Sequence, residues 1–130
     1  MGSLLTKGAN MHENWRELAA GMTPAIKELH AGAPEVMKGF SAIARAALEP
    51  KALDAKIKEL IALGIAVAVR CDACIAFHAE SAVKRGATRE EVMETMGMAI
   101  YMGAGPSVMY AAQAVEAYDQ FSAARLAENA

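Results

Sequence analysis

Three features of this 130-residue sequence predict an all-α protein. Hydrophobic residues make up 55% of the chain, whereas aromatic side chains reach only 5% and Ala and Met are frequent. Such side chains favour helices and let them pack closely. Apolar residues also recur at helical spacing, and Gly, Pro and capping residues separate the periodic segments. We therefore expect a compact single-domain bundle of about six helices.

The first two helices are expected before residue 50. The first covers about residues 13–30, where Pro24 is expected to start a new turn, and the second covers about residues 34–48. Pro34 suits the first turn of a helix because its missing N–H would have no partner there. Residues 1–12 are expected to be a loose lead-in.

Two further helices are predicted at the centre of the chain. Asp54 can cap a helix that continues to about Val69 and is apolar almost all round, which is typical of a buried central helix. The next helix should run from near Cys71 to about Arg85, with Gly86 as its C-terminal stop. Only a short turn separates the two helices.

The last two helices have the clearest start and stop signals. Thr88 and Glu91 form a capping box that opens the fifth helix. The Gly-Ala-Gly-Pro segment at residues 103–106 ends it, and Pro106 begins a final Ala-rich helix that reaches about Phe121.

Charge and hydropathy argue against two classes of partner. The net charge of −2 provides no basic field for nucleic acid. The longest uncharged apolar run before the cysteines, residues 60–69, is about half of what a membrane crossing needs. The amino end also lacks the extended apolar segment of a secretory signal. We expect a cytoplasmic protein without nucleic-acid or membrane partners.

Four chemically reactive side chains lie close together in the sequence: Glu59, Cys71, Cys74 and His78. Spacings of three and four residues place the two cysteines and the histidine on one face of one helix. In a cytoplasmic chain, two cysteines are more often catalytic or metal-binding than joined in a structural disulfide. This cluster is therefore the candidate site.

The spacing of these four residues resembles the carboxymuconolactone decarboxylase superfamily, specifically its alkylhydroperoxidase D-like branch. Eleven residues separate Glu59 from Cys71, two separate the cysteines, and three separate Cys74 from His78. The resemblance covers about residues 36–121. Two further landmarks of the branch follow at residues 85–91 and 99–106.

The resemblance implies a fold, an assembly and an activity. It implies a core domain at residues 36–125 with the active site on a central helical hairpin, and it leaves residues 1–35 as a variable N-terminal helical extension. Members usually form trimers or hexamers. The implied activity is reduction of organic hydroperoxides through a Cys71–Cys74 dithiol/disulfide cycle, with no bound cofactor. An external dithiol, lipoyl- or thioredoxin-like, would restore the thiols.

The residues themselves support this chemistry. The Cα atoms of Cys71 and Cys74 should lie about 5 Å apart, within the range of a disulfide. A helix N-terminus favours the thiolate of Cys71, and His78 one turn away favours that of Cys74. No other charged residue follows Glu59 until Arg70, so its carboxylate should be partly desolvated on a central helix. We expect His78 to activate a thiol and Glu59 to accept a proton, and we favour Cys74 as the His-activated sulfur.

Three alternatives remain open. The four residues could bind zinc, although a single Cys-x-x-Cys pair departs from structural zinc spacing. The chain could be a helical oligomer that binds a small ligand without turnover. It could also be a lactone decarboxylase, which needs no cysteine pair. Better-studied peroxidases of the branch carry a histidine beside the second cysteine, where this chain has Asp72 and Ala73, so retention of activity is itself open.

Overall fold

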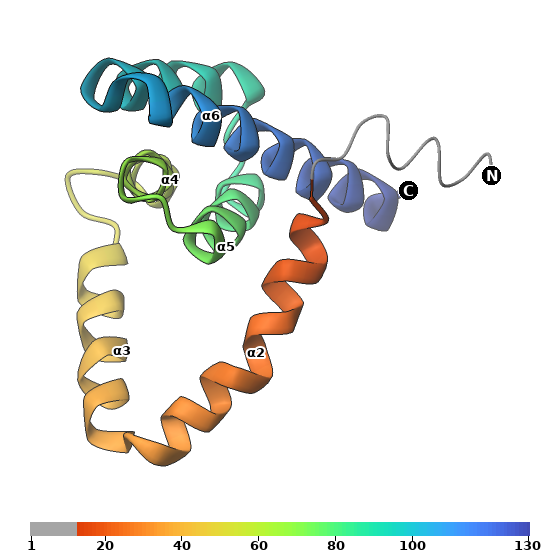
Figure 1. Ribbon diagram of the computed structural model, residues 1–130. Helices are drawn as coiled ribbons and strands as arrows, with labels where there is room; N and C mark the ends of the chain where they lie inside the picture. Colours follow the sequence, from red (N-terminus) through yellow and green to blue (C-terminus); the bar gives the residue numbers. More distant parts are fainter. Residues whose placement is uncertain (1–12) are drawn as a thin grey trace.

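The computed structural model describes residues 13–130, and every regular element in this part of the chain is an α-helix. The predicted lead-in at residues 1–12 lies outside the described residues. Figure 1 shows α4 and α5 at the centre below α6, with α2 and α3 forming a V on the other side. The all-α prediction is confirmed. The helices are α2 (Trp15–Gly32), α3 (Pro34–Leu48), α4 (Ala55–Val69), α5 (Asp72–Lys84) and α6 (Arg89–Asn129).

Helix α6 consists of two segments joined by a sharp reversal. Ala104 has φ 56° and ψ −144°, which no helix accommodates, and Pro106 follows it. Residues 93–100 of the first segment and residues 108–115 of the second line one shared pocket, so the segments lie side by side (Figure 1). A Cβ at Gly103 would collide with the Ser107 side chain, so this turn needs glycine there. The helix break predicted for this segment is present.

The capping box that opens α6 is present as predicted. The backbone N–H of Glu91 donates to the Thr88 hydroxyl at 3.1 Å, and the Glu91 carboxylate accepts the Thr88 N–H at 2.8 Å. Lys56 of α4 reaches the same carboxylate at 2.9 Å. The Thr88 backbone bond and then the Lys56 bond hold the pKa of Glu91 below its ordinary value. The same carboxylate therefore starts α6 and ties it to α4.

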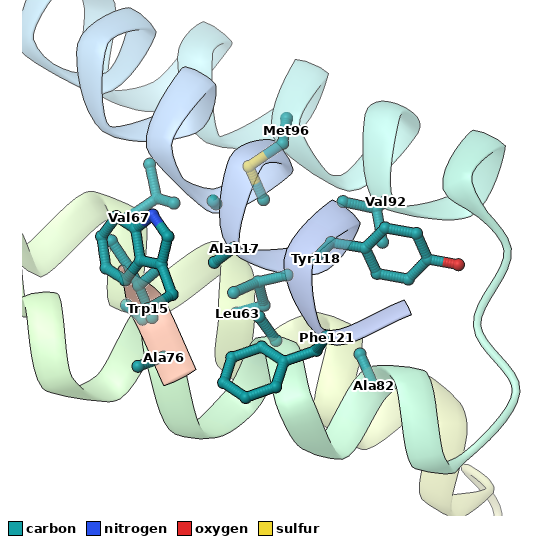
Figure 2. Packing of buried hydrophobic residues seen from close by; sticks show 14 of the residues in the cluster. Trp15, Leu63, Val67, Ala76, Ala82, Val92, Met96, Ala117, Tyr118 and Phe121 are labelled. Atoms are coloured by element: carbon teal, nitrogen blue, oxygen red, sulfur yellow. The ribbon is translucent and has the colours of Figure 1, made fainter. Parts of the chain in front are cut away.

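The hydrophobic core lies where α4, α5 and both segments of α6 meet. Leu63, Val67 and Ile75 are fully buried there. The side of α5 that enters the core carries small residues, which allow close helix contact: Ala76, Ala79 and Ala82. Figure 2 shows this cluster from close by, with the large rings of Trp15 and Phe121 among the side chains.

The start of α2 is fastened to the second segment of α6. The indole Nε1 of Trp15 donates to Glu116 at 2.8 Å, and the Trp15 backbone N–H donates to Gln120 at 2.8 Å. Gln120 in turn donates to the carbonyl oxygen of Glu13 at 2.7 Å. Residues within the predicted N-terminal extension, Trp15 and Ala19, therefore belong to the same core as the central helices.

Helix α2 differs from the prediction at Pro24. A new turn was expected there, but α2 continues through this residue to Gly32. Proline removes a backbone hydrogen bond to the carbonyl four residues earlier. Because Ala20 and Pro24 are both exposed, solvent can satisfy that carbonyl, and the helix is not forced to end.

No helix among residues 13–130 is both long and apolar enough to cross a membrane.

Candidate active site

Two helices that follow each other in the chain carry the four predicted site residues. Glu59 lies in the second turn of α4, Cys71 immediately precedes α5, and Cys74 and His78 lie in the first half of α5. Since α4 and α5 pack against each other, the chain brings the carboxylate to the side of α5 that carries the histidine.

A tight turn at Arg70 positions the first cysteine. Arg70 adopts a left-handed conformation with φ 60° and ψ 50°, and its N–H donates to the Val67 carbonyl at 3.2 Å. The Cys71 N–H donates to the Ala66 carbonyl at 3.1 Å. These bonds close the end of α4 and place Cys71 directly at the beginning of α5.

Cys71 is the N-cap of α5 and not a residue within the helix, which corrects the prediction of one shared helix face for all three side chains. Its backbone is extended, with φ −106° and ψ 101°, and its Sγ accepts the Cys74 N–H at 3.2 Å. An N-cap residue has non-helical dihedrals, so the angular spacing of a helix does not apply to it. The sulfur therefore lies at the helix N-terminus, where unpaired N–H groups favour a thiolate.

The two cysteines are joined as a disulfide in the structure. Their Cα atoms are 5.2 Å apart, close to the separation expected from the sequence. The structure therefore describes the oxidised form of this cysteine pair.

Glu59 and His78 form a pair between α4 and α5. His78 Nδ1 lies 2.8 Å from Glu59 Oε2, although 19 residues separate them in the chain. The Glu59 side chain is 8% exposed, whereas the His78 side chain is 32% exposed. A neutral imidazole that donates from Nδ1 to a carboxylate leaves Nε2 as its acceptor. The buried carboxylate thus orients the ring and sets which nitrogen can take a proton.

The histidine is closer along the helix to Cys74 than to Cys71. Cys74 and His78 are four residues apart within α5, and such positions share one face with Cβ atoms about 5–6 Å apart. Cys74 is only partly buried and packs against the core. A different group can therefore favour the thiolate form of each cysteine: the helix N-terminus for Cys71 and the imidazole for Cys74.

Among residues 13–130, no group of three or more His, Cys, Asp or Glu side chains is arranged to hold a metal ion.

Sequence reasoning did not identify Arg70 as a feature of the site. Its left-handed backbone cannot be read from the residue type, because Gly or Asn is the usual choice at such a position. The only available signal was a charged residue that interrupts an apolar run directly before Cys71.

Comparison with known proteins gives a consistent family assignment. Residues 34–117 match the carboxymuconolactone decarboxylase family, and this range includes all four site residues. An uncharacterized protein from Haemophilus influenzae is 41% identical over 108 residues, which are 83% of this chain and 96% of that protein. An uncharacterized protein from Cupriavidus necator is 40% identical over 90 residues, which are 69% of this chain and 80% of that protein.

A solved structure extends the comparison to the fold. The crystal structure of an apo carboxymuconolactone decarboxylase family protein from Legionella pneumophila is similar to this chain, with a TM-score of 0.81 and 50% sequence identity. The similarity covers 83% of this chain and 96% of that chain.

Proposed function

This chain belongs to the carboxymuconolactone decarboxylase family, and we propose that within it the protein is a thiol-dependent peroxidase that reduces organic hydroperoxides. One observation carries the proposal: a Glu59–His78 pair lies beside a Cys71–Cys74 pair that can close as a disulfide. A lactone decarboxylase has no need of the cysteine pair.

The first half of the reaction oxidises the cysteines. A thiolate attacks the terminal oxygen of the hydroperoxide, the O–O bond breaks, and the alkoxide takes up a proton and leaves as an alcohol. The resulting sulfenic acid is attacked by the second cysteine, which releases water and forms the Cys71–Cys74 disulfide. Two thiols are oxidised for each hydroperoxide reduced to an alcohol.

In this proposal His78 transfers the protons and Glu59 orients the imidazole, whereas the sequence had suggested that Glu59 itself accepts a proton. We assign the attack to Cys74 because His78 lies one helical turn away and can accept the thiol proton at Nε2. Glu59 holds the ring through Nδ1 and stabilises the imidazolium that forms. The same imidazolium can return its proton to the departing alkoxide.

The second half of the reaction needs an external dithiol. Attack by such a dithiol, lipoyl- or thioredoxin-like, opens the disulfide through a mixed disulfide and restores both thiols. This step fits a reducing compartment such as the cytoplasm. No resident cofactor is needed, because the electrons come from the dithiol.

Reaction with one equivalent of cumene hydroperoxide tests the proposal. The reduced protein should lose both free thiols and the mass of two hydrogens, and a dithiol should reverse both changes. Cys71→Ser should trap a sulfenic acid on Cys74 that dimedone labels, whereas Cys74→Ser should show little labelling. Retention of both thiols in the wild-type protein would refute the peroxidase proposal. Labelling of Cys74→Ser alone would assign the attack to Cys71 instead.

A further inference from the structure

A large part of the chain projects from the core and is only partly covered by it. We define the arm as residues 20–48, which comprise α2 after its docked first turn and all of α3 (Figure 1). No residue of the arm is buried. Helices of this length are marginally stable in water unless an apolar face is packed. The arm therefore needs a partner surface.

The apolar side chains of α3 form one ridge. Val36, Phe40 and Ile43 recur at positions i, i+4 and i+7, which lie on one face of a helix. Their exposed fractions are 71%, 61% and 66%.

A matching groove lies between α4 and the first segment of α6. It has a volume of about 440 Å³ and no charged residue in its lining. Ile57, Ile61 and Ile65 line it along three turns of α4, and Met98 and Met102 line it from α6. The sequence predicted that α4 would be buried almost all round, but these isoleucines are 40–56% exposed.

The ridge and the groove agree in length and in chemistry. Helices α3 and α4 each contain 15 residues, so each is about 22 Å long. In a reciprocal exchange each copy contributes both its ridge and its groove, on the order of 1,000 Å² of apolar surface per copy, which is comparable with the about 800 Å² per partner that a stable interface buries. A small ligand in the groove would leave the ridge uncovered. A second copy of this chain covers both surfaces.

We propose that α3 of one copy packs lengthwise into the α4/α6 groove of a second copy. The contact joins two different surfaces, so it closes either as a reciprocal exchange of arms or as a ring. The proposal does not depend on the peroxidase chemistry, because neither surface contains a site residue.

Charge substitutions in the two surfaces test the contact. Phe40→Glu places a charge on the ridge and Ile61→Glu places one in the groove, and both side chains are exposed in a single copy. Sedimentation velocity should show an oligomeric wild type and at least about 100-fold weaker association for each variant. Leu126→Glu is the matched control, since Leu126 is 70% exposed but lies outside both surfaces, and it should associate like the wild type.

Mixing the two variants makes the test specific. Phe40→Glu keeps an intact groove and Ile61→Glu keeps an intact ridge, so an equimolar mixture should form a dimer that neither variant forms alone. Phe40→Ala and Ile61→Ala, which add no charge, should weaken association less than the Glu variants do. A monomeric wild type at 100 µM, with the groove open to an apolar dye, would overturn the proposal, as would failure of the mixture to associate. Thiol oxidation by hydroperoxide, measured on the same samples, tests the peroxidase proposal separately.

Discussion

Glu59 and His78 show what a single contact adds to a sequence motif. The cysteine and histidine spacing could be read directly from the chain, and it identified the candidate site. The 2.8 Å contact between Glu59 and His78 could not be read from the chain, because it depends on how α4 packs against α5. The N-cap position of Cys71 was also missed, since the helix boundary shifts by one residue through the turn at Arg70.

The Glu59–His78 pair leads to a prediction about rate. His78→Ala removes the proposed acceptor of the thiol proton, so disulfide formation with hydroperoxide should slow by about 100-fold at neutral pH. Glu59→Gln keeps the size of the side chain but not its charge, so we expect a smaller loss of about tenfold. Stopped-flow measurement of thiol loss compares these rates.

His30→Ala is the matched control for this prediction. His30 is an exposed histidine in the last turn of α2 with no role in the proposed site. Its replacement should leave the rate unchanged. Equal rates in His78→Ala and the wild type would show that the imidazole does not activate either cysteine.

Helix boundaries were predictable where local chemistry decides them. The Thr88–Glu91 capping box and the break at residues 103–106 follow from residue types alone. Residue types alone do not predict that α2 continues through Pro24 or that one face of α4 is exposed. Burial decides both features, and the sequence does not show which neighbours pack there.

The reversal in α6 predicts opposite effects for one type of substitution. Ala104 has a positive φ that suits glycine, so Ala104→Gly should stabilise the protein by about 1 kcal/mol. Ala123 is an exposed residue inside regular helix, so Ala123→Gly should destabilise it by about 1 kcal/mol. Urea unfolding monitored by circular dichroism measures both values. Destabilisation of similar size in both variants would mean that Ala104 is not strained.

At the scale of the whole molecule, the fold class could be predicted from the sequence, but the packing of the N-terminal residues against the core could not. Composition and periodicity were sufficient for an all-α bundle, and the similarity to the Legionella pneumophila crystal structure supports the same architecture. The family match begins at residue 34, yet Trp15 is fully buried in the core and hydrogen-bonded to Glu116. A long-range contact of this kind has no local sequence signal. For this reason the stable unit of the chain extends beyond the family match.

Steady-state turnover tests the central claim most directly. The reduced wild-type protein, supplied with excess dihydrolipoamide and cumene hydroperoxide, should convert many equivalents of hydroperoxide to alcohol per chain. The protein with both Cys71→Ser and Cys74→Ser provides the background rate of the free dithiol and should show no turnover above it. A wild-type rate equal to that background, with both thiols intact and one zinc ion per chain by metal analysis, would contradict the account and assign the four residues to a metal site.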